Sequence, residues 1–181
     1  SHSFTLRTAA GIKDPYKVAT SKEIEDMVFL AEKFLKNGAY GIHFGLEFVP
    51  GTSKEELLSL SAISKKHNRV ILVHLRKDGK EALNCFDEII HVARNTKVSV
   101  HILHLMYMVG FKGVMGRALE IVEAARKKGY DITADSGLYS AFPTCIGSSI
   151  LDPGWEKGYG CNATVEKLLI SSGIYSGQFC N

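Results

Sequence analysis

Two stretches decide the fold: Arg69-Val-Ile-Leu-Val-His74 and Val98-Ser-Val-His-Ile-Leu-His104. Each is a short, mainly apolar run that ends in a histidine. Runs that are apolar at consecutive positions, and not only at alternate ones, are typical of parallel strands covered on both faces. A histidine at the carboxyl end of such a strand lies where α/β folds have their chemistry.

The same strand pattern recurs along the chain, with amphipathic helices between its copies. The strand starts are about 30 residues apart, which is the size of one βα unit. Strands are predicted at 39–44, 69–74, 98–104 and 130–134. No glycine-rich phosphate fingerprint follows a strand, so a (β/α)8 barrel is favoured over an open doubly wound sheet.

Helix starts are indicated by capping pairs and by apolar stripes at helical spacing. Thr20 with Glu23 and Thr52 with Glu55 are predicted to begin two helices. Apolar residues at helical spacing predict further helices over 80–95 and 117–128.

The length sets how much of a barrel the chain contains. A complete (β/α)8 barrel needs about 250 residues, whereas this chain has 181. Four units are clear, and a further strand is expected to end near Leu6. We therefore predict a partial barrel, with its central and later βα units in 1–141. An irregular, glycine-containing tail with a short helix at 164–171 is expected in 142–181.

Composition narrows the functional class. The net charge is +3, and the Lys and Arg residues are scattered, which argues against a nucleic-acid partner. No apolar run approaches the roughly 20 residues needed to cross a bilayer, so no membrane partner is expected. The absence of a basic-then-apolar leader predicts a cytoplasmic protein. The four cysteines form no CxxC pair and are expected to be free thiols.

His74 and His104 are the first candidate site residues. At the ends of neighbouring strands they would either bind one metal ion together, as zinc ligands do, or bond separately to loop carbonyls. Strand alternation predicts that Val100 and Ile102 share the barrel-facing side with His104, while His101 faces the helix layer.

Other candidates follow the strands. Glu47 would face the site or pair with Arg76, and Asp135 would be a ligand, a base or a helix cap. His43 is expected to be packed or solvated. Tyr139 would bind substrate or pack. The apolar loop 105–116 would line a pocket, act as a lid, or pack against protein outside this chain.

Four motifs carry a family resemblance: Gly41-Ile-His-Phe-Gly-Leu-Glu-Phe-Val-Pro-Gly-Thr52, Val73-His-Leu-Arg76, Ile102-Leu-His-Leu105 and Thr133-Ala-Asp135. In order and spacing they resemble the N-acyl-D-amino-acid deacylases, which are D-aminoacylase-like members of the metal-dependent amidohydrolase superfamily. The resemblance covers most of residues 1–145.

The resemblance implies a zinc-bearing barrel that hydrolyses the amide of an N-acylated D-amino acid, with N-acyl-D-glutamate as one option. His74 and His104 fall on the family's two metal-binding histidines. In such enzymes zinc polarises the amide carbonyl and activates water, and an aspartate transfers the proton. That aspartate, the family's HxH and its cysteine ligand are not found in this chain, so the chain alone is expected to be inactive.

Substrate contacts are expected at Glu47, Arg76, Met106 and Tyr139, although Met106 replaces a frequent family lysine and Lys77-Asp78-Gly79 a frequent glutamate. The alternative function is a non-catalytic α/β module. A partial barrel has two unpaired sheet edges, so either the rest of a barrel or a second copy of the chain is expected to cover them.

Overall fold

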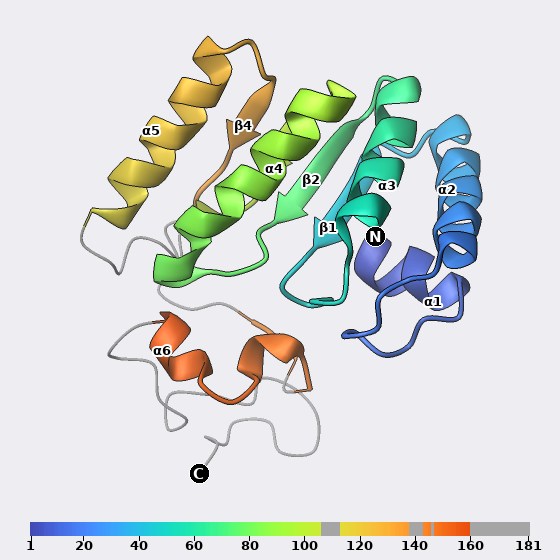
Figure 1. Ribbon diagram of the computed structural model, residues 1–181, viewed down its shortest axis with the longest axis horizontal. Coiled ribbons are helices and arrows are strands. Elements are labelled where there is room, and N and C mark those ends of the chain that lie inside the picture. Colours follow the sequence, from blue (N-terminus) through green and yellow to red (C-terminus); the bar gives the residue numbers. More distant parts are fainter. Residues whose placement is uncertain (106–112, 138–142, 146, 160–181) are drawn as a thin grey trace.

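The computed structural model describes residues 1–105, 113–137, 143–145 and 147–159. Its centre is a parallel sheet with the strand order β1-β2-β3-β4 (Figure 1). The strands are β1 Gly41–Gly45, β2 Val70–His74, β3 Val100–Ile102 and β4 Ile132–Ala134. Each strand pairs with the next one in the sequence.

Helices join the strands and lie on one face of the sheet. They are α3 Lys54–Lys66, α4 Ala82–Thr96, which follows the short η2 Gly79–Glu81, and α5 Val114–Lys127. Figure 1 shows α3 and α4 in front of the strands and α5 beside β4. A doubly wound sheet reverses its strand order and has helices on both faces, whereas sequential order with one helical layer is barrel topology. The predicted partial (β/α)8 barrel is therefore confirmed.

The helix starts predicted from capping pairs agree with the structure to within one residue. Helix α2, Ser21–Lys36, begins at the predicted box, in which Thr20 and Glu23 each bond to the other's backbone N–H. Helix α3 begins one residue later than predicted, because the Ser53 hydroxyl accepts the Glu56 N–H at 3.1 Å. Ser53 competes with Thr52, whose hydroxyl donates instead to the Val49 carbonyl.

The start of the chain is helical, so the strand predicted to end near Leu6 was wrong. Residues His2–Leu6 form η1 and Arg7–Ala9 form α1. Glu56, at the start of α3, accepts hydrogen bonds from both segments. Arg7 Nη1 lies 2.8 Å from each carboxylate oxygen, and His2 Nε2 lies 2.7 Å from Oε1. All three side chains are buried, and the backbone pairs within the helical turns, as where the Leu6 N–H donates to the Ser1 carbonyl at 3.1 Å.

The pairing register sorts the strand side chains into two faces. Buried residues on the helical face form the core: Ile42, Ile71, Val100 and Ile132, then Phe44, Val73 and Ile102. The opposite face, which would be a barrel interior, carries His43, Leu72, His101 and Thr133 at one level. The prediction that Val100 and Ile102 face the barrel interior and His101 the helices was therefore wrong.

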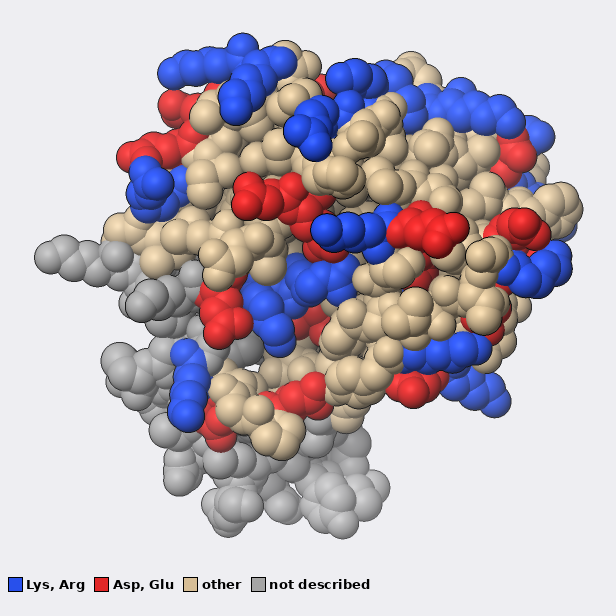
Figure 2. Space-filling model, viewed as in Figure 1, with Lys and Arg blue, Asp and Glu red and all other residues tan. Residues whose placement is uncertain are grey.

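Basic residues gather where the helices end. Lys65 and Lys66 lie in the last turn of α3, and Arg126 and Lys127 in that of α5. Figure 2 shows Lys and Arg along the upper rim, above the ends of these helices. Positive charge near a helix C-terminus is favourable because it interacts with the helix dipole. These four of the chain's 22 Lys and Arg residues therefore lie where the helix dipole favours positive charge.

The C-terminal part of the described chain lies beyond the carboxyl ends of the strands (Figure 1). It contains η4, Ser149–Leu151, and α6, Trp155–Tyr159. The Ser149 hydroxyl donates to the Glu47 carbonyl at 2.6 Å, and the Tyr16 hydroxyl donates to Asp152. The predicted helix at 164–171 lies outside the described residues. Among the helices described, none has the length and apolar character to cross a membrane.

Candidate metal centre

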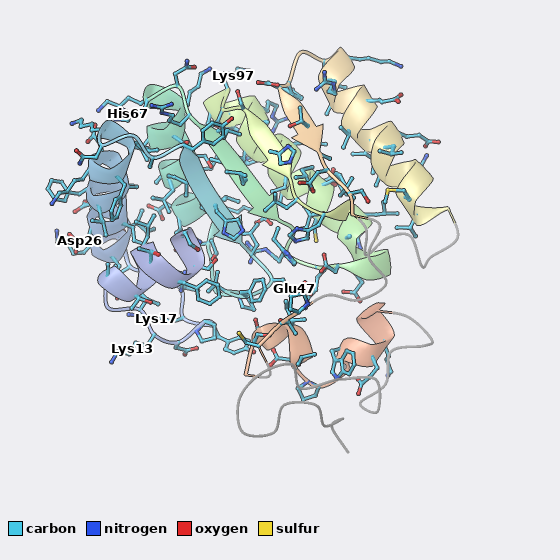
Figure 3. All side chains as sticks on the ribbon, turned by 180° about the vertical axis from the view of Figure 1, so that it is seen from behind. Lys13, Lys17, Asp26, Glu47, His67 and Lys97 are labelled. Carbon is cyan, nitrogen blue, oxygen red and sulfur yellow. The ribbon has the colours of Figure 1, made fainter. Side chains whose placement is uncertain are left out.

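The candidate site lies at the carboxyl ends of β1, β2 and β3. His74 is the last residue of β2, Glu47 follows β1 by two residues, and His104 follows β3 by two. Asp78 comes from the turn before η2. Figure 3 shows Glu47 at this end of the sheet, far from His67 and Lys97 at the other. Parallel strands bring these four side chains together because their carboxyl ends share one edge.

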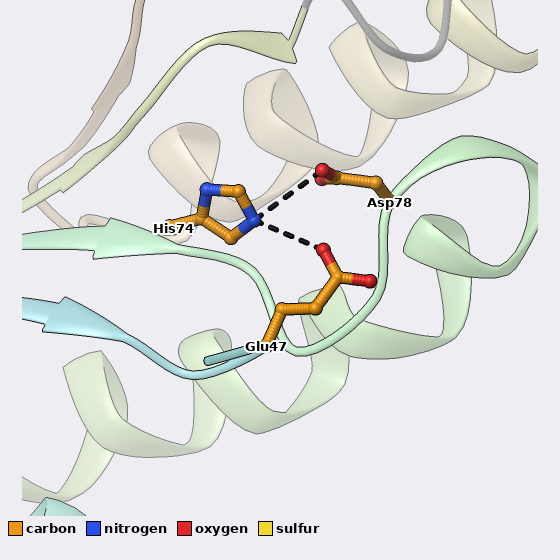
Figure 4. A group of neighbouring side chains, drawn as sticks. All are labelled: Glu47, His74 and Asp78. Atoms are coloured by element: carbon orange, nitrogen blue, oxygen red, sulfur yellow. Dashed lines mark hydrogen bonds and ion pairs between the residues drawn. The ribbon is translucent and has the colours of Figure 1, made fainter. Parts of the chain in front are cut away.

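His74 lies at the centre of the group and uses both ring nitrogens. Its Nδ1 lies 2.6 Å from His104 Nε2. Its Nε2 lies 3.0 Å from Glu47 Oε2 and 3.3 Å from Asp78 Oδ2 (Figure 4). His74, Glu47 and Asp78 are buried. The two histidines predicted to share one point therefore do approach each other.

The carboxylates control the protonation of His74. Burial opposes a charged ring, but the hydrogen bonds with Asp78 and Glu47 outweigh it and raise the pKa of His74 to about 9. Burial and the nearby Asp78 carboxylate raise the pKa of Glu47, against the effect of its bond with His74. Nε2–H therefore donates to the carboxylates, and Nδ1 is directed at His104.

The pKa of His104 is shifted in the opposite direction to that of His74. Burial and the charge on His74 lower the pKa of His104. The proton between the rings thus belongs to His74, whose Nδ1–H donates to His104 Nε2. Replacement of that single proton by a cation would leave both nitrogens with a lone pair directed at it, which is how neutral imidazoles bind metals.

The donor set fits a transition metal on either side of His74. Its Nδ1 and His104 Nε2 are two imidazole nitrogens, which suit zinc. Ligand atoms on one tetrahedral zinc are about 3.3 Å apart, so the rings would separate slightly from their 2.6 Å approach. On the other side, ligand atoms of Glu47, His74 and Asp78 lie within 4.8 Å of one another.

Arg76 is held on the outer side of the sheet. Its Nε and Nη2 donate to Glu88 of α4 at 3.0 and 2.8 Å. Its Nη1 and Nη2 donate to the Pro50 and Thr52 carbonyls at 2.9 and 3.0 Å. The sequence allowed Glu47 either to face the site or to pair with Arg76. In the structure Glu47 faces the site, where it contacts His74.

The remaining candidates divide between described and undescribed residues. His43 is half-buried on the barrel-facing side, and burial lowers the pKa of His43 to about 4. Among the described residues Asp135 caps no helix, and its carboxylate accepts the His104 N–H. Met106, Tyr139 and most of the loop 105–116 lie outside the described residues.

Asp78 is the site residue that sequence reasoning missed. Lys77-Asp78-Gly79 was counted as a departure from a family glutamate, and Asp78 was given no role of its own. The carboxylate nonetheless reaches His74 Nε2. The available signal was its spacing, because a residue four positions after a strand-end histidine is close enough to turn back over the ring.

Comparison with known proteins supports the resemblance noted in the sequence. No family model matches the chain. A curated D-aminoacylase from Alcaligenes xylosoxydans xylosoxydans is 30% identical over 151 residues, which is 81% of this chain and 30% of that protein. The chain therefore spans about a third of the length of the curated relative that it matches.

Solved structures agree with the sequence match. A D-aminoacylase, described for a binuclear metal centre in which one metal activates and a second attenuates, is 30% identical with a TM-score of 0.68, covering 77% of this chain and 29% of that one. An N-acyl-D-glutamate deacylase from Bordetella bronchiseptica, complexed with zinc and a phosphonate inhibitor, has a TM-score of 0.67 at 24% identity, covering 77% of this chain and 30% of that one. The second likeness concerns the fold alone.

Proposed function

We infer the function of this chain from the family to which it belongs, the D-aminoacylase-like amidohydrolases. We propose that it is part of a zinc-dependent enzyme that hydrolyses the amide bond of an N-acyl-D-amino acid. The observation that carries the proposal is the 2.6 Å approach of His74 Nδ1 to His104 Nε2 at adjacent strand ends.

His74 Nδ1 and His104 Nε2 are proposed to hold the zinc ion. Glu47 and Asp78 would then act from behind His74, because accepting its Nε2–H fixes the tautomer that leaves Nδ1 free to bind metal. A carboxylate behind a metal-binding histidine also raises the basicity of the ring. This assignment uses each nitrogen of His74 once and accounts for both buried acids.

When bound, zinc would polarise the amide carbonyl and activate water for attack on it. The chain's own residues would orient the two imidazoles and hold them close together. The proton-transferring aspartate implied by the family has not been found in these residues, and the chain spans only 30% of its curated relative. We therefore propose that the 181-residue chain shows no deacylase turnover alone.

Substrate contacts stay predictions. Glu47, Arg76, Met106 and Tyr139 were expected to contact substrate. Glu47 is bonded to His74 and Arg76 to Glu88, which supports orienting and anchoring roles for these two. The preference for an N-acyl-D-glutamate side chain and the cytoplasmic location are likewise predictions.

Zinc titration of the 181-residue chain tests the ligand assignment. Competition with a chromophoric chelator measures affinity for the original chain and for His74→Ala, His104→Ala and His67→Ala. Loss of zinc binding is expected in the first two variants. His67→Ala is the matched control, since His67 pairs with Glu32 at the opposite end of the molecule.

Glu47→Ala and Asp78→Ala separate the two possible metal positions. Because Glu47 and Asp78 are proposed to lie behind the ligand His74, each substitution should weaken zinc binding by about 10- to 100-fold. If binding survives His104→Ala but is abolished by both acid variants, zinc lies on the Nε2 side and the assignment is wrong. In an enzyme containing this chain, His74→Ala and His104→Ala should each remove deacylase turnover, and activity retained in both would refute the proposal.

Self-association is the alternative function, and one observation favours it. Within the described residues, β1 and β4 each have a neighbouring strand on one side only, and exposed sheet edges favour pairing. Solution mass measured over a range of concentrations tests this alternative. A monomer at every concentration would exclude it without affecting the zinc assignment.

A further inference from the structure

The pairing between β3 and β4 shifts by one residue as the strands end. Val100 N–H donates to the Asp131 carbonyl at 2.8 Å. Parallel pairing repeats every two residues, so the His104 N–H would be expected to reach the Asp135 carbonyl. The Leu105 N–H donates there instead, at 2.9 Å. One extra residue therefore lies on the β3 side, as in a β-bulge.

His104 is the residue left out of this pairing. Its φ is +40°, in the left-handed region that costs free energy for a residue with a Cβ. Its N–H donates to the Asp135 side-chain oxygen Oδ1. At the same time the Asp135 N–H donates to the Ile102 carbonyl at 3.1 Å. Asp135 therefore bonds to the chain on both sides of the extra residue.

The left-handed residue determines where the imidazole points. Ile102 faces the helices, so an unbroken strand would place His104, two residues later, on that same face. The bulge turns the His104 ring to the opposite face instead, where its Nε2 meets His74 Nδ1. The close approach of the two rings thus depends on a strained backbone conformation.

The Asp135 carboxylate is itself held in place. Its Oδ2 lies 3.2 Å from His101 Nε2. His101 Nδ1 lies 2.8 Å from Thr133 Oγ1, and the Thr133 hydroxyl lies 3.4 Å from the Val100 carbonyl. These contacts join β3 to β4 on the barrel-facing side and direct Oδ1 toward the His104 N–H.

We propose that Asp135 is a positioning residue for His104: its carboxylate replaces the lost ladder acceptor and holds the left-handed backbone that presents the ring to His74. The functional consequence of this inference rests on the proposed function, in which His104 binds zinc. The hold of Asp135 on the His104 backbone is expected in the metal-free chain as well.

Amide hydrogen exchange in the metal-free chain tests this hold of Asp135 on the His104 backbone. We compare the original chain with Asp135→Ala, Asp135→Asn and Asp131→Ala, the last removing an exposed carboxylate at the opposite end of β4. Loss of a hydrogen bond to a charged acceptor should speed exchange at His104 by about 10- to 100-fold in Asp135→Ala. Asp135→Asn keeps an oxygen acceptor and should change less. If Asp135→Ala does not fold, Asp135→Asn alone must still speed exchange.

Zinc affinity, measured on the same variants, tests the consequence for the site. Asp135→Ala should weaken binding by about 10- to 100-fold, Asp135→Asn by less, and Asp131→Ala not at all. Unchanged His104 exchange in both Asp135 variants would overturn the positioning role, whatever the zinc result. If the original chain binds no zinc while His104 exchange still depends on Asp135, the zinc assignment fails and the positioning role stands.

Discussion

Replacement of Glu56 by alanine would break the buried ion pair with Arg7 and the buried hydrogen bond with His2, which join α3 to the start of the chain. The substitution removes the acceptors of Arg7 Nη1 and His2 Nε2, with bonds of 2.7–2.8 Å. The Arg7 guanidinium, 1% exposed, would keep the Lys17 carbonyl as a partner. Removal of one member of a buried pair costs about 3–5 kcal/mol, because a charge stays buried. We expect the upper half of that range, because two buried partners lose their acceptor.

Urea denaturation at 25 °C and neutral pH measures the effect. With an m value of about 2 kcal/mol/M, the loss corresponds to a fall of roughly 2 M in the unfolding midpoint. Glu55→Ala is the matched control, since Glu55 is the exposed neighbour and should change stability by about 0.5 kcal/mol at most. The double variant Arg7→Met/Glu56→Met should be more stable than Glu56→Ala, because neither charge is left buried. A Glu56→Ala midpoint equal to that of Glu55→Ala would refute the reasoning.

Three further predictions concern other parts of the chain. Burial opposes ionisation of Glu56, but its hydrogen bond with His2 and its ion pair with Arg7 hold its pKa below the ordinary value. Its stabilising effect is therefore complete above the unfolded pKa of about 4.3 and is lost as the pH falls through the folded pKa, and a urea series should find this acid slope missing in Glu56→Gln. In Gly41→Ala the new Cβ would lie 2.1 Å from the Val70 carbonyl oxygen, so β1 and β2 must separate and thermal unfolding should show a loss of about 3 kcal/mol; an unchanged midpoint would contradict this. Arg76→Ala should lower the free energy of unfolding by about 1.5–3 kcal/mol, because its bonds with Glu88 are lost, and should leave zinc affinity unchanged. A higher KM in the complete enzyme without a change in stability would instead favour the predicted substrate contact.

The fold was predictable from the sequence because its signals are periodic. Continuous apolar runs marked all four strands, and the repeat of about 30 residues set the order of strands and helices. The segment around Leu6 was mistaken for a strand because the stabilising partner of Arg7 and His2 is Glu56, about 50 positions away. No local pattern can report such a partner.

The site was predictable only in part. Strand-end position was enough to bring His74 and His104 together. Strand alternation, counted back from His104, assigned His101 to the wrong face, because alternation assumes an unbroken strand. The left-handed conformation at His104 breaks it, and that conformation depends on Asp135, a tertiary contact. The role of Asp78 likewise depends on how a turn folds back.

The His74-Leu-Arg76 stretch connects two environments within three residues. His74 faces the candidate metal position, whereas Arg76 fastens the same stretch to α4 and to the loop that precedes α3. The outer layer therefore restrains the path of the backbone just beyond the histidine. Laboratory evolution aimed at this site has reason to sample Glu88, since a change there alters how firmly this stretch is held while both imidazole ligands are kept.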